Sequence, residues 1–160
     1  LAGRAVPPSP DEAHSPLLIY RWSETTAELD RALEAGGGTV ARVEFVSPQS
    51  RGPVMATLGC AMIRIAGGAR TAPFRATGSS IYVVRSGAGR SVIAGVEMSW
   101  TEGDIFVSPS WTAVEHLGES KSDLFVVSDR PVLEALHLYR EELLDEPQLV
   151  EEKFNRCRTS

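Results

Sequence analysis

The 160-residue sequence is poor in cysteine and has no long apolar run. Its two cysteines, Cys60 and Cys157, stand far apart and do not make up a disulfide framework, so we expect a protein of the reducing cytoplasm. No apolar segment approaches the roughly 18 residues that a membrane-spanning helix needs. The first residues also lack the charged and then apolar pattern of a secretory signal. Membrane binding is therefore not expected.

Positive charge is scarce as well. Sixteen lysines and arginines stand against 21 aspartates and glutamates, which gives a formal net charge of −5. No basic stripe is present that could neutralise phosphates, so nucleic acid is not an expected partner. With 42% apolar residues, the chain is long enough for one buried core and too short for two ordinary domains.

What the sequence does contain is a series of short strands separated by turns with glycine or proline. The strand-forming runs lie at 40–46, 55–65, 81–84, 91–94, 96–100, 105–107 and 123–127. They are rich in β-branched and aromatic residues or alternate apolar with polar ones. Strands this short are typical of an antiparallel barrel or sandwich rather than of βαβ units, so the predicted fold class is all-β.

Two helices are expected to flank the strands. Thr25 and Glu28 have the spacing of a capping box, which predicts the start of a helix that ends at Gly36. A second helix is predicted to begin near Ser128, with a proline in its first turn, and to end at Pro147. Its apolar stripe is expected to contact another lobe or subunit and comprises Leu133, Leu136, Leu143 and Leu144.

These patterns divide the chain into three parts. Residues 1–16 are rich in proline, alanine and serine and are expected to form a linker. Residues 17–146 are expected to form a single domain that includes both flanking helices. Residues 147–160 are polar and are expected to form a flexible tail.

The spacing of turn residues between 68 and 118 resembles the two motifs of the cupin superfamily. Gly68 and Gly87 frame the first motif, and Gly103 and Pro109 frame the second. The resemblance implies a double-stranded β-helix, the jelly-roll barrel of the cupins.

The metal ligands of these motifs are absent from the sequence. In the cupin alignment, the two histidines and the glutamate of the first motif fall on Phe74, Ala76 and Ser80, and the histidine of the second falls on Val114. Divalent iron, manganese or zinc needs three or four imidazole or carboxylate donors, which these side chains do not offer. His116 would face the same side of a strand as Val114, but one imidazole does not hold a catalytic metal. We therefore expect no metal, no cofactor and no catalytic residue in this chain.

A narrower pattern covers nearly the whole chain. It comprises residues 15–18, 20–22, 52–59, 70–75, 106–111 and 127–142. Together these segments resemble the C-terminal cupin lobe of the gentisate, salicylate and 1-hydroxy-2-naphthoate ring-cleaving dioxygenases. The resemblance implies an enzyme of aromatic catabolism with two cupin lobes, in which the N-terminal lobe carries the ferrous iron on histidines and the C-terminal lobe lacks them. Because the equivalent of Leu1 lies between the lobes in such enzymes, the chain is expected to be a fragment, a processed product, a separately encoded lobe or a trimmed lobe.

Three functions are open at this point. The first is a non-catalytic, structural lobe that assembles with a second cupin lobe or into a homo-oligomer. The second is a free-standing, metal-free cupin that binds a small aromatic or apolar molecule, such as an aromatic acid, in its barrel. The barrel lining is then expected to comprise Phe74, Ala76, Tyr82, Trp111, Val114 and His116. The third is an unusual enzyme in which His116 performs acid–base chemistry with Glu115 or Tyr82.

Overall fold

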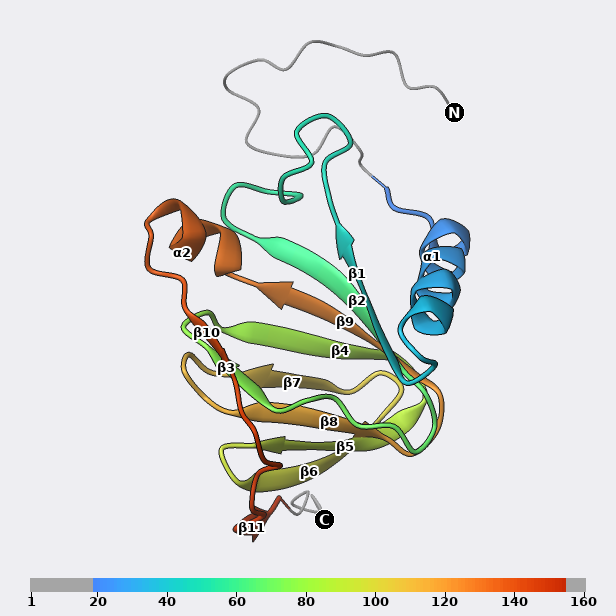
Figure 1. Cartoon of the computed structure of the whole chain (residues 1–160), viewed down its shortest axis with the longest axis vertical. Helices are drawn as coiled ribbons and strands as arrows, with labels where there is room; N and C mark the ends of the chain where they lie inside the picture. The colour runs from blue at the N-terminus through green and yellow to red at the C-terminus, as the bar shows by residue number, and fades with distance from the viewer. Residues whose placement is uncertain (1–18, 155–160) are drawn as a thin grey trace, which may run out of the picture.

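Two β-sheets packed face to face form the body of the protein (Figure 1). The computed structural model describes residues 19–154 of the chain. The first sheet has the order β1-β2-β9-β4-β7, with bounds β1 Val40–Phe45, β2 Gly59–Ile65, β9 Ser122–Ser128, β4 Ser80–Ser86 and β7 Ile105–Ser108. The second has the order β10-β3-β8-β5-β6-β11, with bounds β10 Glu141–Leu143, β3 Phe74–Ala76, β8 Val114–Gly118, β5 Ala88–Ile93, β6 Val96–Thr101 and β11 Glu152–Lys153. The all-β prediction is confirmed.

The core lies between the sheets because alternate residues of each strand face inward. Along β4, Tyr82 and Val84 are each 1% exposed, whereas Ile81, the neighbour of Tyr82 in the same strand, is 47% exposed. Inward-facing residues of both sheets meet in one cluster that comprises Ile63, Ile65, Tyr82, Val84, Ile93, Trp100, Phe106, Val114, Leu124 and Val126. Alternate burial along the strands thus builds the core from both sheets.

Gly87 shows why glycine stands at a corner of the barrel. Its φ of 87° lies in the left-handed region, and it joins β4 to β5. A Cβ atom at this position would lie 2.3 Å from Oγ of Ser122 and 2.6 Å from the carbonyl oxygen of Lys121. A larger residue would therefore force the turn away from the start of β9.

The N-terminal helix α1, Trp22–Ala35, covers the outer face of β1 and β2 (Figure 1). It ends at Gly36 as predicted, but the capping-box prediction is wrong. The helix begins three residues before Thr25, so the Thr25 hydroxyl lies inside the first turn and donates to the carbonyl oxygen of Arg21 at 3.2 Å. Within residues 19–154, no side chain caps the start of this helix.

A buried arginine fixes α1 to the sheet. Arg64 of β2 is 2% exposed, and its Nε and Nη2 atoms donate to the carboxylate of Asp123 at 2.7 and 2.9 Å. Its Nη1 atom donates to Asp30 of α1 at 2.7 Å. Because both carboxylates neutralise the guanidinium, the charge can be buried between helix and sheet.

The predicted C-terminal helix is much shorter than expected. The helix α2 comprises only Arg130–Ala135, with Pro131 in its first turn as predicted. The chain then turns at His137, whose φ is 57°, and continues as β10 along the free edge of β3. Leu143 therefore lies in a strand rather than on a helical stripe. Pairing with β3 and the ion pair between Arg75 and Glu142, at 2.6 Å, stabilise the strand over the helix.

The segment after residue 146 lies against the second sheet. The backbone N–H of Gln148 donates to Glu115 at 3.1 Å, and its side chain donates to the carbonyl oxygen of Val92 at 2.8 Å. Further along, β11 pairs with β6 in parallel. The structure thus places residues 147–154, for which a flexible tail was expected, in contact with the domain.

One further strand boundary differs from the prediction, and two predictions concern residues that the structure does not describe. The strand expected at 55–65 begins only at Gly59. The expected linker at 1–16 and Cys157 lie outside the described residues. Neither helix within the described part of the chain is long and apolar enough to cross a membrane.

Candidate functional site: a cavity without metal donors

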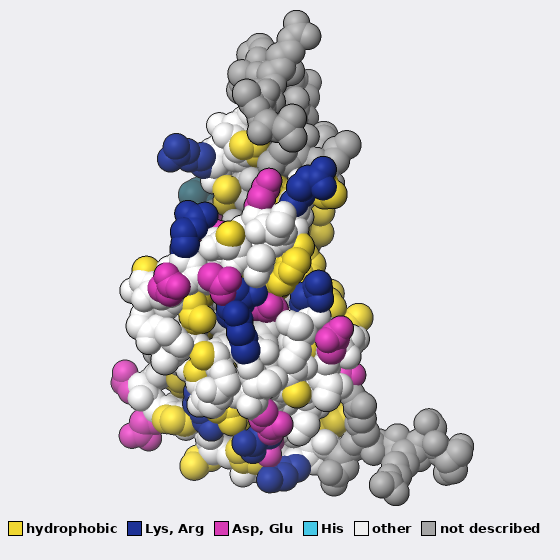
Figure 2. All heavy atoms as spheres, turned by 90° about the vertical axis from the view of Figure 1, so that its right-hand side faces the viewer, with side chains coloured by type: hydrophobic (Ala, Val, Ile, Leu, Met, Phe, Trp, Pro, Cys, Tyr) yellow, Lys and Arg dark blue, Asp and Glu magenta, His cyan; other side chains and the backbone are white. Residues whose placement is uncertain are grey.

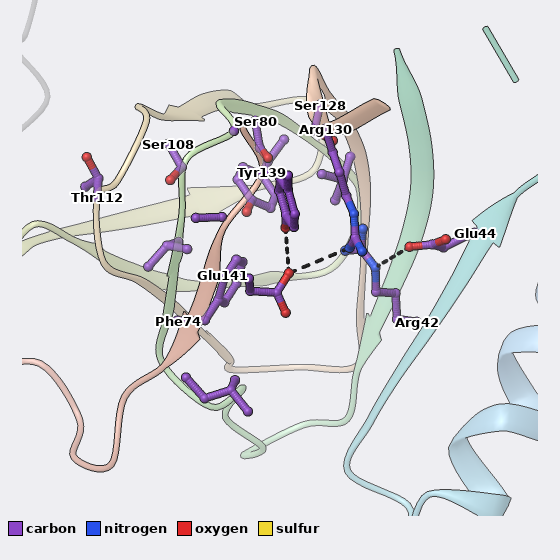
Figure 3. A pocket seen from close by; sticks show the side chains of 16 residues that line it. Arg42, Glu44, Phe74, Ser80, Ser108, Thr112, Ser128, Arg130, Tyr139 and Glu141 are labelled. Atoms are coloured by element: carbon purple, nitrogen blue, oxygen red, sulfur yellow. Dashed lines mark hydrogen bonds and ion pairs between the residues drawn. The ribbon is translucent and has the colours of Figure 1, made fainter. Parts of the chain in front are cut away.

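A cavity of about 320 Å³ opens between the two sheets, at the end of the barrel next to α2 and β10 (Figure 3). Its apolar lining consists of Phe74, Ala76, Tyr82, Val114, Val126 and Leu143. Its hydroxyl-bearing lining consists of Ser80, Ser108, Thr112, Ser128 and Tyr139. Its charged lining consists of Arg42, Glu44, Arg130 and Glu141.

The four positions at which the cupin alignment places metal ligands all line this cavity. Phe74 and Val114 lie opposite each other on β3 and β8, Ala76 follows on the same face of β3, and Ser80 begins β4. None of these side chains carries an imidazole or a carboxylate. A divalent metal needs several such donors, so the residues present do not fit a metal ion. In residues 19–154, no group of three or more histidine, cysteine, aspartate or glutamate side chains could hold one.

Tyr82 forms the floor of the cavity. Its ring stacks on Phe106 with 4.9 Å between centroids. Burial raises the pKa of Tyr82 to about 12, although the positive charge of Arg42 and a hydrogen bond with Ser80 act in the opposite direction. The phenol is therefore uncharged at neutral pH and can donate a hydrogen bond but not act as a base.

His116 was expected in the lining but lies in the core behind Tyr82. It is 1% exposed, and its ring meets Tyr82 edge-on at 4.8 Å. Its Nδ1 atom lies 2.7 Å from Oγ of Ser91, which also accepts the indole N–H of Trp100 at 2.8 Å. Since the Ser91 oxygen already accepts that hydrogen, the arrangement favours donation from Ser91 to Nδ1 and a hydrogen on Nε2 of His116.

The environment of His116 does not support acid–base catalysis. Burial lowers its pKa from 6.5 to about 3, so the ring is neutral at physiological pH. Its Nε2 atom is buried and has no hydrogen-bond partner among the described residues. Glu115 faces the other side of β8, as strand alternation predicts, and pairs with Arg70 at 3.3 Å. The acid–base pair of Glu115 and His116 that the sequence left open is therefore not formed.

Trp111 is the other expected lining residue that lies elsewhere. Its φ of 57° turns the chain between β7 and β8, and the side chain is 42% exposed. The ring packs against the guanidinium of Arg75, with 4.8 Å from Cζ to the ring centroid. Arg75 itself faces outward, as alternation with Phe74 and Ala76 predicts. A left-handed turn cannot be recognised from the identity of a tryptophan, which explains the wrong placement.

The sequence did not predict the charged residues at the opening of the cavity, hereafter its mouth. Arg42 and Glu44 lie on the inward face of β1, opposite to Val43 and Phe45, which pack towards α1. The signal was present in the alternation of charged and apolar residues along this strand, but the sequence does not reveal that the inward face of β1 adjoins a cavity.

The other side of the mouth is built by residues after β9. Tyr139 donates to Glu141 at 2.5 Å, and a nitrogen of Arg130 lies 3.7 Å from the same carboxylate. Burial and the hydrogen bond to Glu141 raise the pKa of Tyr139 to about 12. These residues reach the cavity only because α2 ends early and β10 returns along β3.

Comparison with known proteins gives one group of relatives. No family model matches the sequence. The chain is 36% identical over 150 residues to 5-aminosalicylate 1,2-dioxygenase from Comamonas sp., covering 88% of this chain and 40% of that protein. It is 37% identical over 139 residues to gentisate 1,2-dioxygenase from Streptomyces sp., covering 82% and 39%.

Solved structures agree with these relatives. Salicylate 1,2-dioxygenase from Pseudoaminobacter salicylatoxidans, in a crystal structure with gentisate, matches with a TM-score of 0.80 and 34% identity. The match covers 84% of this chain and 39% of that chain. The chain thus spans about two fifths of the length of these relatives.

Proposed function

Because this chain is a cupin domain of the gentisate-type family of ring-cleaving dioxygenases, we propose that it acts as a metal-free, non-catalytic lobe that supports a metal-bearing lobe. The iron-dependent ring cleavage of the assembly would lie outside this chain. The correspondence of the chain to the C-terminal lobe of such enzymes, and its place in the cytoplasm, are parts of the same proposal.

The observation that carries the proposal is the set of side chains at the ligand positions. Phe74, Ala76, Ser80 and Val114 surround one cavity, so the geometry that would bring ligands together is retained. Their chemistry provides at most one weak, neutral oxygen donor. A scaffold of this kind keeps the barrel stable without binding a metal.

The outer face of the first sheet supports a role in assembly. Ile81 pairs with Val107, and Val83 pairs with Ile105, so the outward side chains of β4 and β7 form two apolar rows. Ile81, Ile105 and Val107 are 47%, 67% and 55% exposed. In Figure 2, which shows the side that carries α1, hydrophobic side chains lie exposed between groups of charged ones.

These rows continue onto β9, where Phe125 lies opposite Val83 and Val127 lies opposite Ile81. Exposed apolar sheet faces of this kind mark interaction sites, and two such faces pack well against each other. We therefore propose that a sheet of a second cupin lobe covers this face, hereafter the outer apolar face. The relatives have room for such a lobe because this chain spans only about two fifths of their length.

The metal content and activity of the chain test the proposal. Protein purified without chelators is analysed for iron by plasma mass spectrometry, and oxygen uptake is measured with gentisate. We expect no stoichiometric iron and no uptake above the protein-free rate. One iron per chain together with gentisate-dependent uptake would overturn the proposal.

A second candidate function is a free-standing domain that binds a small aromatic or apolar molecule. The cavity itself is the observation that favours it, because its floor is apolar and aromatic. Sedimentation velocity separates the two candidates. A clean monomer at all concentrations, whose outer apolar face binds no partner, would favour the free-standing domain.

A further inference from the structure

The first sheet ends in a free edge at β7. This strand is the last in the order β1-β2-β9-β4-β7, and within residues 19–154 it pairs with β4 alone (Figure 1). Edge strands are commonly protected from pairing with other chains by lysine or proline. The four residues of β7, Ile105–Ser108, include neither, and Pro109 follows directly after the strand. The edge is therefore open to a further strand.

The hydrogen-bond pattern directs the backbone groups of Ile105 and Val107 to this edge. Val84 donates its N–H to the carbonyl oxygen of Asp104 at 2.9 Å, which fixes the phase of the ladder between β4 and β7. Hydrogen-bonded and non-hydrogen-bonded pairs alternate in an antiparallel ladder, so the backbone groups of Phe106 face β4. The N–H and C=O groups of Ile105 and Val107 point the other way and have no backbone partner in the described part of the chain.

Apolar side chains flank the edge on both sides of the sheet. On the outer side, Ile105 and Val107 are 67% and 55% exposed. On the inner side, a cleft of about 640 Å³ lies between β7 and β6. The apolar part of its lining includes Met98, Trp100, Phe106 and Phe154. A strand added to β7 meets backbone donors and acceptors at the edge and apolar surface on either side, which is the mode of β-strand addition.

The strand is complementary to a second copy of itself. In an antiparallel pair centred on Phe106, Ile105 lies opposite Val107 of the second copy, and Val107 lies opposite the other Ile105. These are the residues whose backbone groups point to the edge, so the pair forms four hydrogen bonds across a two-fold axis. Asp104 then lies opposite Ser108, so like charges do not face each other at this pair of positions.

Neighbouring registers satisfy fewer backbone groups. A shift of one residue sets groups that point to the edge against groups that point to β4. Centring the pair on Val107 sets Ile105 against Pro109, which has no N–H. Centring it on Ile105 sets Val107 against Gly103, whose N–H already donates to Val84 at 2.9 Å. The register centred on Phe106 is therefore favoured.

We propose that two copies of this chain associate edge to edge through β7, in antiparallel register centred on Phe106, so that two five-stranded sheets become one continuous sheet. The contact uses the backbone edge of β7, whereas the outer apolar face uses side chains on one side of the sheet. It does not depend on a second cupin lobe covering that face. Because only four residues of each copy meet at the edge, we expect a Kd on the order of 0.1 mM.

Cysteine cross-linking tests this register. Both native cysteines are replaced by alanine, and Ile105→Cys and Val107→Cys are made separately in that background. The two new thiols lie opposite each other only when the two variants are mixed, at a Cα separation of roughly 5.5 Å that a disulfide can bridge. In either variant alone they lie on a diagonal of roughly 7–8 Å, which is too long. We therefore expect covalent dimers from the oxidised mixture and few from either variant alone.

The matched variants for affinity are Val107→Pro and Val107→Ala. Proline removes an N–H that points to the edge, and edge strands tolerate proline at such a position. Alanine shortens the same side chain but keeps the N–H. By sedimentation velocity, Val107→Pro should dimerise about tenfold more weakly than Val107→Ala or worse. Far-UV circular dichroism confirms that both variants are folded.

Three results would overturn the inference. These are cross-linking in the mixture that is no greater than in the single variants, equal dimerisation of folded Val107→Pro and Val107→Ala, and loss of cross-linking when Ile81→Lys is added to both partners. The last would show that the outer apolar face, on which Ile81 lies, carries the contact. Iron content and oxygen uptake are measured separately, so the edge contact can fail while the proposed metal-free role stands.

Discussion

Phe74 of β3 lies directly opposite Val114 of β8 in the ladder of the second sheet. These are the positions at which the two cupin motifs would each contribute a histidine. The barrel thus brings the corresponding backbone positions together, although neither side chain carries an imidazole or a carboxylate.

Restoring imidazoles at these positions should create a metal site. We expect the triple variant Phe74→His, Ala76→His, Val114→His to bind about one Co²⁺ per chain with the visible absorption of a nitrogen-coordinated ion, whereas the wild type binds none. The control moves one histidine to an outward position, in Phe74→His, Arg75→His, Val114→His. A folded triple variant that binds cobalt no better than this control would contradict the geometry described for the cavity.

Ser91 is expected to stabilise the core through two hydrogen bonds. Replacing it by alanine leaves the indole N–H of Trp100 and Nδ1 of His116 without their partner in a buried site. We expect Ser91→Ala to lower the free energy of unfolding by about 1–3 kcal/mol. Urea denaturation measures the change, and Ser99→Ala on the exposed face of β6 should stay within about 0.5 kcal/mol of the wild type. Equal stability of the two variants would show that the network contributes nothing.

Buried His116 should make the protein less stable as the pH falls. Its pKa is about 3 in the folded state and near 6.5 when exposed, so the unfolded chain binds one more proton between these values. The contribution of the neutral ring to stability is complete above pH 6.5 and is lost as the pH falls towards 3, with a slope of up to about 1.4 kcal/mol per pH unit.

The difference between wild type and His116→Gln isolates this effect from the carboxylates. Urea unfolding at pH 7.5, 6 and 5 should show the stability advantage of the wild type shrinking as the pH is lowered. His137→Gln is the control for replacing a histidine by glutamine, because His137 is exposed. A constant difference between wild type and His116→Gln would contradict the prediction.

Charged residues on the outer apolar face should abolish association through it. We expect the isolated wild-type chain to bind the apolar dye bis-ANS and to self-associate with rising concentration, because the rows on β4 and β7 are uncovered. The double variant Ile81→Lys, Val107→Lys should lose most of both properties. Ser99→Lys introduces a lysine on an exposed position of the other sheet and should behave like the wild type. Dye binding and sedimentation that are unchanged in the double variant would argue against an interface at this face.

Much of the barrel could be predicted from short-range patterns. The runs at 81–84 and 105–107 were predicted as strands and lie in β4 and β7, Tyr82 was expected inside and is buried, and the left-handed conformation of Gly87 agrees with its place in the first motif. The spacing of the motifs also placed Phe74 and Val114 at one cavity. The strands depend on residues close in sequence and on a period of two, whereas the meeting of Phe74 and Val114 was available only from the resemblance to the cupins.

The C-terminal part could not be predicted in the same way. Its leucines and glutamates favour a helix, but the free edge of β3 offers backbone partners to residues 141–143, and the strand forms there instead. The backbone pairing that stabilises this strand is made with a segment more than 60 residues earlier in the chain, as the pairing of Glu142 with Arg75 shows. Intrinsic propensity is a weak preference that such tertiary contacts override.

By itself, the sequence determined an all-β fold, because alternation and turn residues depend on positions close together in the chain. The resemblance to the cupins identified four ligand positions, and the residue types found there carry no imidazole or carboxylate. Only the tertiary structure decided what surrounds the resulting cavity. Arg42 and Arg130 both line it because β1 and α2 lie at the same end of the barrel. His116 does not line it because it is buried deeper in the core, and Trp111 does not because a left-handed turn directs its side chain elsewhere. The physical reason is that a residue's neighbours across the sheets, rather than along the chain, decide whether its side chain is buried, paired or open to a ligand.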